Sequence, residues 1–467
     1  MPCQLCGGNA LGISVENGKD AMNNNPDNFD GADGESDPRD FNPADFQAFL
    51  QKYLNNPNSF DAAELAKAAG LPQDPEQLKQ MLGMLSQAMG RQNAVDGVDW
   101  SVALQHAKTT ARKENHGVTE SQRDAWRNAV SIATLWLDQA TEVSGLTTEP
   151  KLLTRDLWVD DAMPLFKAMS EPVANRMAVA LSEHLSSNTP EELAGLMKEA
   201  GRLLRSAGGA MFAMQLGTAI GKLSSTVLSG ADIGLPIFTE QRAAFVPQNI
   251  DEFISGLDVE AQQAQIYLAV RELAHARLFK HSKWLRDHVV AQISSYAADI
   301  SIDDNKIEEA ASAMDLTNPS QMQNLLESGA LLGDRTAEQE RALEAIETML
   351  ALIEGWVDAV TQEATKLLPK AAAISEAVRR RRATGGPAEL TFGTLVGLEL
   401  KPRKLREATS MWLELGMAMG NAKRDELWDH PDMLPTTTDI ENPSLLITRL
   451  QGGGDDFDAE LRNLLGN

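Results

Sequence analysis

The sequence predicts a mainly α fold, and three observations support this prediction. Apolar residues recur at helical spacing from about residue 43 to residue 445. Capping residues stand before prolines throughout that region, as at Asn42-Pro43, Asp74-Pro75 and Asn318-Pro319. Alternating β-branched residues occur only near 390–400, where we expect at most a short β-hairpin. The expected fold is therefore a multi-helix body.

Composition divides the chain into four parts. Residues 1–42 contain many Asn, Asp and Gly and few apolar side chains, so they cannot offset the entropy lost on ordering, and we expect a disordered acidic tail. Residues 43–96 are rich in Gln and Met and predict a small helical segment. Residues 97–445 form the predicted helical domain. Residues 446–467 contain three consecutive glycines, and we expect a flexible acidic C-terminal tail there.

The charge balance narrows the classes of partner. The chain has 42 basic and 67 acidic residues, a net charge of −25, which argues against binding DNA, RNA or anionic membranes. The N-terminus carries no secretory signal, and two cysteines cannot build a disulfide framework, so we expect a cytoplasmic protein. Cys3 and Cys6 lack the second ligand pair that a structural zinc site needs.

The most apolar stretch, residues 207–238, is interrupted by Gln215, Lys222 and Asp232. A membrane span needs about 20 apolar residues with few charges, so we expect a buried helix here and no membrane partner. Small residues recur every four positions within it, at Ala213, Gly217 and Gly221. This spacing predicts that a neighbouring helix approaches closely.

Two predicted helices carry residues with the potential for chemistry. Residues 264–279 are apolar around most of the circumference, which is typical of a buried helix, yet they include Arg271, Glu272 and His275. Charged groups on a buried helix need partners. We therefore expect polar side chains of another element to face this helix.

The second helix is predicted over 336–361. Thr336 and Gln339 have the spacing of a capping box at its start. Glu354 and Asp358 are four residues apart, so their carboxylates point to the same side. Gly355 lowers helix propensity by about 1 kcal/mol relative to alanine, which suggests that another backbone lies close to it.

The pattern Arg271-Glu272-Leu273-Ala274-His275, followed by Glu354, differs by one residue from H-E-x-x-H…E. In that motif, two histidines one turn apart and a downstream glutamate bind zinc, while the intervening glutamate is the general base. From the pattern alone, a satisfied polar pair on a helix is the commoner explanation.

Longer stretches resemble the zincin-like metallopeptidase type 2 family of actinobacteria. They include residues 266–279, 350–358 and 395–399, together with the specific run Arg379-Arg380-Arg381-Arg382-Ala383-Thr384-Gly385-Gly386-Pro387. The resemblance extends over roughly residues 97–445 and implies a zincin-like fold, a zinc cofactor and a peptide or protein substrate.

The resemblance also implies roles for individual residues. Glu272 matches the general base, and His275 and Glu354 match zinc ligands. Arg271 stands where the family has its first histidine ligand, and a guanidinium has no lone pair to offer a metal. Asp358 is the candidate to replace that ligand. Alternatively, Arg271 forms a bidentate pair with Glu354 or Glu272 and crosslinks the two helices in place of zinc.

Three functions therefore remain open. The first is a zinc-dependent metallopeptidase that hydrolyses peptide bonds with Glu272 as base. The second is a catalytically lapsed metallopeptidase fold that acts as a binding or scaffold protein. The third is a phosphate- or nucleic-acid-binding protein that uses the arginine run at 379–382. For that run we favour a structural role, with the arginines pairing with the excess carboxylates.

Overall fold

The computed structural model describes residues 98–187, 194–238, 242–298, 335–383, 393 and 404–452. The mainly α prediction is confirmed. The first helices along the described chain are α4 (Trp100–Ala111), α5 (Glu120–Ala140), α6 (Arg155–Ser187), α7 (Ala194–Ser224), α8 (Pro247–Ser255), α9 (Ala261–His281) and α10 (Leu285–Ala298). They are followed by α13 (Ala337–Ala364), α14 (Ala371–Ala383), α16 (Leu405–Met419), α17 (Asn421–Glu426), the 3₁₀ helix Pro431–Met433 and α18 (Thr437–Glu441).

A two-stranded parallel sheet stands beside these helices. Strand β1 (Lys151–Leu152) pairs with β2 (Ala244–Phe245), and Ser229 bridges Phe245 on the other side of β2. Two-residue strands are too short to show an alternating pattern, so the sequence did not predict this sheet. The hairpin expected near 390–400 lies outside the described residues apart from Gly393, as do residues 1–97.

Helix α9 is buried over the whole of residues 264–279, as its circumferential hydrophobicity predicted. It packs against α5, α13 and α14. Helix α13 begins at the predicted Thr336 cap, where Thr336 and Gln339 form the capping box. Both predicted helices are therefore confirmed, and each extends a few residues beyond its predicted end.

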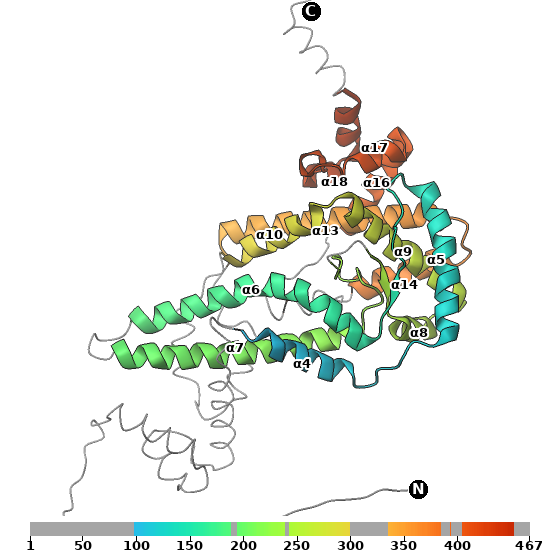
Figure 1. Cartoon of the computed structure of the whole chain (residues 1–467). Helices are drawn as coiled ribbons and strands as arrows, with labels where there is room; N and C mark the ends of the chain where they lie inside the picture. The colour runs from blue at the N-terminus through green and yellow to red at the C-terminus, as the bar shows by residue number, and fades with distance from the viewer. Residues whose placement is uncertain are drawn as a thin grey trace, which may run out of the picture. The chain divides into compact units, whose positions relative to one another are not determined.

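Helix α7 runs beside α4 and α6 (Figure 1). A Cβ atom added at Gly217 would collide with the carbonyl oxygen of Ala103 and lie 2.7 Å from the Cβ of His106. One added at Gly221 would lie 2.5 Å from the Cβ of Thr110. The predicted close approach is therefore real, although the helix ends at Ser224 instead of continuing to residue 238.

The C-terminal boundary also differs from the prediction. Residues 443–452 are helical, although we expected a flexible tail from residue 446. Leu446 is fully buried, and Arg449 donates to both carboxylate oxygens of Asp439 at 2.9 Å. These contacts attach the segment to α18.

Within the described part of the chain, no helix combines the length and the apolar character needed to cross a bilayer.

Candidate active site between α9 and α13

The Glu354 side chain is the centre of a buried ion cluster. It lies on α13 and is 1% exposed. Its Oε2 accepts hydrogen bonds from Arg271 on α9 and from Arg382 Nη1 on α14, the latter at 2.5 Å. Its Oε1 lies 3.1 Å from His275 Nε2. The structure thus brings His275 and Glu354 together, as the sequence predicted, and pairs Arg271 with Glu354 through one oxygen instead of the expected bidentate geometry.

Burial and neighbouring charges shift the pKa values of the residues in this cluster. Burial alone raises the pKa of Glu354, but Arg382, Arg271 and His275 outweigh that effect and hold the pKa well below its ordinary value. Burial lowers the pKa of His275, and the neighbouring Glu354 carboxylate compensates only in part. Burial lowers the pKa of Arg271, but Glu354 and Asp358 outweigh it and the pKa is raised. At neutral pH the cluster therefore holds one carboxylate, two guanidinium groups and a neutral imidazole.

Glu272 faces away from this cluster and binds backbone groups. Its oxygens accept hydrogen bonds from the N–H of Ala231 at 3.1 Å and of Ala244, in β2, at 3.0 Å. Complete burial raises its pKa to about 7, against the opposing hydrogen bonds of Ser229, Ala244 and Ala231. Glu272 therefore tethers β2 and the loop before it to α9.

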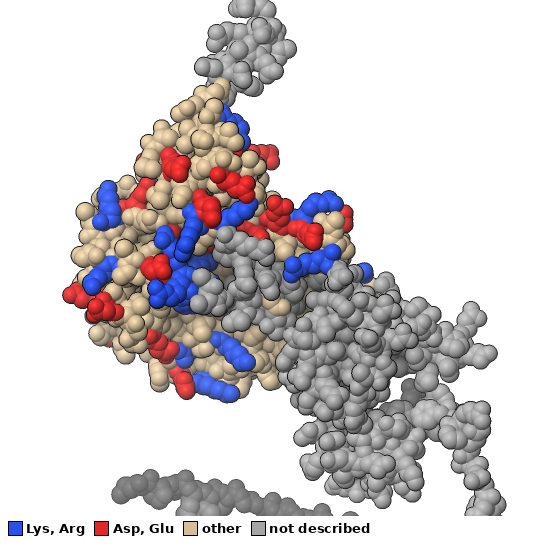
Figure 2. All heavy atoms as spheres, turned by 180° about the vertical axis from the view of Figure 1, so that it is seen from behind, with Lys and Arg blue, Asp and Glu red and all other residues tan. Residues whose placement is uncertain are grey.

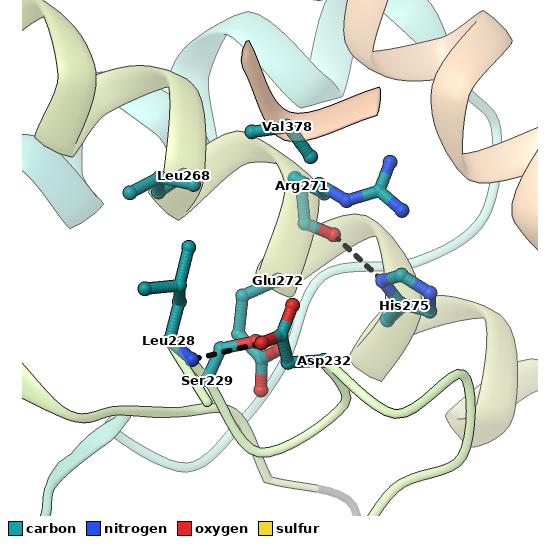
Figure 3. Close-up of a pocket in the computed structure, with 8 residues that line it drawn as sticks. All are labelled: Leu228, Ser229, Asp232, Leu268, Arg271, Glu272, His275 and Val378. Atoms are coloured by element: carbon teal, nitrogen blue, oxygen red, sulfur yellow. Dashed lines mark hydrogen bonds between the residues drawn. The ribbon is translucent and has the colours of Figure 1, made fainter. Parts of the chain in front are cut away.

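A small cavity borders both Glu272 and the Glu354 cluster. It has a volume of about 10 Å³ and is lined on one side by Arg271, Glu272 and His275 (Figure 3). Val378 of α14 lies across the cavity from Glu272, and Asp232 lies beside Glu272. This volume is enough for about one water molecule. The predicted general base, Glu272, and the predicted histidine ligand, His275, therefore border the same cavity.

Asp358, the candidate replacement ligand, is occupied elsewhere. Its Oδ2 accepts hydrogen bonds from Arg379 at 2.6 Å, Gln362 at 3.2 Å and Thr409 at 3.3 Å. Among the described residues, no three His, Cys, Asp or Glu side chains lie close enough together to hold one metal ion. The structure therefore does not bring Asp358 into one ligand group with His275 and Glu354.

The arginine run at 379–382 supplies three pairs around the site. Arg379 binds Asp358, Arg382 binds Glu354, and Arg381 binds Asp232 at 2.9 and 3.2 Å. Arg380 turns outward and pairs with Glu376 of its own helix. Acidic and basic residues also lie interspersed on the face drawn in Figure 2. The structural role that we favoured for the run thus agrees with its contacts.

Sequence reasoning missed Asp232 and Arg382 as parts of the site. Each had a signal in the sequence: Arg382 belongs to the arginine run, and Asp232 opens the segment Asp232-Ile233-Gly234-Leu235-Pro236. Gly234 has a φ of +84°, and a Cβ atom there would lie 3.4 Å from Glu354 Oε1. A glycine therefore permits the left-handed turn that carries this loop over the cluster.

Gly355 explains how α13 and α16 come close beside the site. A Cβ atom at this position would lie 2.7 Å from the Cβ and 2.9 Å from the carbonyl carbon of Ala408. The close neighbour predicted for Gly355 is therefore present, and it is the backbone of α16. This contact fixes the part of α13 that carries Glu354.

The comparison with protein families decides the identification. Residues 98–447, well over half of the chain, match the zincin-like metallopeptidase family. The chain belongs to that family. Its fold is also similar to a solved structure described as "a putative hydrolase with a novel fold" from Chloroflexus aurantiacus, with 18% identity and a TM-score of 0.53. That similarity covers 76% of this chain and 99% of the other. No curated protein matches the chain.

A zincin-like metallopeptidase implies zinc, but the residues present do not fit that ion. Catalytic zinc sites use three protein ligands, whereas His275 and Glu354 are the two donors brought together here. Arg271 stands where the resemblance implies the first histidine ligand, and its guanidinium has no lone pair to supply the missing third ligand. Arg382 adds a second cation beside the same carboxylate. The donor set is therefore that of an ion-pair cluster.

Proposed function

We propose that this zincin-like metallopeptidase has lost zinc catalysis and acts as a binding or scaffold protein for a peptide or protein segment. The observation that carries the proposal is the complete use of the Glu354 carboxylate. One oxygen is shared by Arg271 and Arg382, and the other faces His275. In this account, Arg271 joins α9 to α13 in the place where the family holds zinc.

Electrostatics supports this proposal. With Glu354 ionised and His275 neutral, the two arginines leave the cluster with a net charge of +1. Two unit charges 4 Å apart interact by about 4 kcal/mol at an effective dielectric constant of about 20. A dication at that distance would meet about twice this repulsion from each guanidinium, and the single carboxylate would compensate only in part.

An active zinc-dependent hydrolase is the second candidate, and one observation favours it. Glu272 has a pKa of about 7 and lines the same cavity as His275. A general base works best with a pKa near the working pH. A peptide or protein substrate would then follow from the family. We expect either form to act in the cytoplasm.

Zinc content distinguishes the two candidates. After exhaustive dialysis, elemental analysis of the purified protein should find far less than one zinc per chain. The protein should then be incubated with a defined peptide mixture and the peptides analysed by mass spectrometry. We expect all peptides to be uncleaved and a subset to be bound to the protein. About one zinc per chain together with cleavage that E272Q abolishes would reject the proposal in favour of the hydrolase.

A further inference from the structure

We infer that α14 is a lid over the cavity between Glu272 and His275, held shut by three arginine–carboxylate pairs. The inference rests on the proposed function only for what enters the cavity, because the opening itself follows from the contacts of α14. In the described structure the lid is closed. Val378, on its inner face, forms the wall of the cavity across from Glu272 (Figure 3).

Apolar contacts hold α14 only weakly. Ile374 and Val378 are its fully buried large apolar side chains, with 0% and 3% exposure. In contrast, α13 is buried without interruption from Met349 to Thr361. A helix with few buried apolar contacts belongs to the part of a fold that opens locally before the core does. The remaining attachment of α14 must therefore be largely polar.

Three arginines near the C-terminal end of α14 supply that polar attachment. Arg379 binds Asp358, Arg381 binds Asp232, and Arg382 binds Glu354. The three arginine side chains are 13–30% exposed, whereas the three carboxylates are 1–7% exposed. The carboxylates thus lie on α13 and on the loop containing Asp232, whereas the arginines lie on the lid, α14. Salt weakens such partly exposed pairs and stabilises the separated charges.

The beginning of α14 is the natural hinge. The turn at residues 365–370 connects it to α13, and the N–H of Lys370 donates to Gln263 Oε1 of α9 at 3.0 Å. The arginines lie toward the opposite end of the helix, with Arg381 and Arg382 in its last turn. Loss of their pairs would therefore free the end of α14 that covers the cavity while the other end stays attached.

Hydrogen exchange of the full chain tests the lid. The variant R379Q/R381Q removes two of the three pairs and leaves Arg382 in place. The control R341Q/R380Q also removes two positive charges. Its arginines pair with Glu338 and Glu376 on exposed surfaces of their own helices, away from the cavity. We expect amides of 372–383 to exchange at least tenfold faster in R379Q/R381Q than in the control, with α9 and α13 unchanged. The wild type should show the same local increase between 50 and 500 mM NaCl.

Chemical modification of His275 tests access to the cavity. His275 is 2% exposed, so diethyl pyrocarbonate should reach it slowly in the wild type and severalfold faster in R379Q/R381Q, as mapped by mass spectrometry. Equal exchange of α14 in the variant and the control would overturn the lid. So would joint acceleration of α9 and α13, or faster α14 exchange without faster His275 modification. None of these results depends on zinc content, so the lid and the proposed function fail separately.

Discussion

Arg271 is the residue on which the proposed loss of zinc catalysis depends. It occupies the first ligand position of the motif, yet it is buried and binds Glu354. Breaking a buried pair by removing one partner costs about 3–5 kcal/mol, because the remaining charge loses its compensation. Here Arg382 and His275 also bind Glu354, so we expect a smaller loss. Arg271 is therefore replaceable in a way that a lone buried partner would not be.

Replacing Arg271 by histidine should increase zinc affinity. R271H removes a positive charge and places an imidazole four residues before His275, on the same side of α9. We expect at least a tenfold gain over the wild type in titration calorimetry with ZnCl₂. The control R271Q removes the same charge without adding an imidazole and should gain less. Equal affinities in R271H and R271Q would show that position 271 does not limit metal binding.

The R271H variant also tests Glu272. If R271H gains zinc together with any peptide hydrolysis, adding E272Q should remove the hydrolysis and leave the zinc content unchanged. In the described contacts, Glu272 binds two backbone N–H groups and no member of the Glu354 cluster. Its loss should therefore spare the metal. Loss of zinc from the double variant would contradict the separate roles of the two residues.

Glu272 should make stability depend on pH. Its folded pKa of about 7 lies above the ordinary 4.5, so between these values the folded state keeps a proton that the unfolded chain releases. The stabilisation is fully present below pH 4.5 and is lost as the pH rises through 7, by at most about 1.4 kcal/mol per pH unit. In urea unfolding from pH 5 to 8, the wild type should lose stability relative to E272Q. A constant difference would exclude this titration.

At the scale of elements, helices meet where the sequence supplies small residues or opposite charges. Gly217 and Gly221 let α7 lie against α4, and Gly355 lets α13 lie against α16. Charges perform the corresponding task for α14, whose arginines reach α13 and the loop containing Asp232. The first kind of contact tolerates no added atoms, whereas the second tolerates movement. This difference separates the rigid body from the proposed lid.

The variant G217A tests the close contact of α4 and α7. The new methyl group would collide with the Ala103 backbone and the His106 side chain, and such overpacking costs about 1–3 kcal/mol. G208A is the matched control, because it lies on the same helix with nothing within 4 Å of its added Cβ. It should leave stability unchanged or raise it by up to about 1 kcal/mol through helix propensity. Urea unfolding that finds equal effects would refute the contact.

At the scale of the whole molecule, the net charge affects which partners can bind, and the apolar core determines stability. The net charge of −25 argues against a polyanionic partner, and the arginines that could have formed a basic patch at 379–382 bind carboxylates instead. The described core is a continuous set of apolar side chains from α4 to the helix that contains Leu446. Stability should therefore depend on residues within the family match, 98–447.

Deleting residues 1–40 tests that expectation. The segment contains few apolar side chains, so its removal should change the melting temperature by less than about 2 °C, equivalent to less than about 1 kcal/mol. Differential scanning calorimetry of the full and shortened chains measures the difference. A large decrease would mean that the segment packs against the helical domain, and it would restore interest in Cys3 and Cys6.

The sequence by itself determined the helical class, the two helices α9 and α13, the Thr336 capping box and the meeting of His275 with Glu354. It also indicated the close packing at Gly217 and Gly355. These features arise from periodicity, capping and spacing, which act over a few neighbouring residues, or from long motifs shared with the family.

Only the tertiary structure decided which charges meet. It placed Arg382 on Glu354, Arg381 on Asp232 and the N–H groups of Ala231 and Ala244 on Glu272, and it kept Arg271 to one oxygen of its partner. The paired groups stand tens to well over a hundred positions apart in the chain. Helical periodicity specifies the direction in which each side chain points from its own axis, whereas the packing of several axes determines which side chains come within hydrogen-bonding distance.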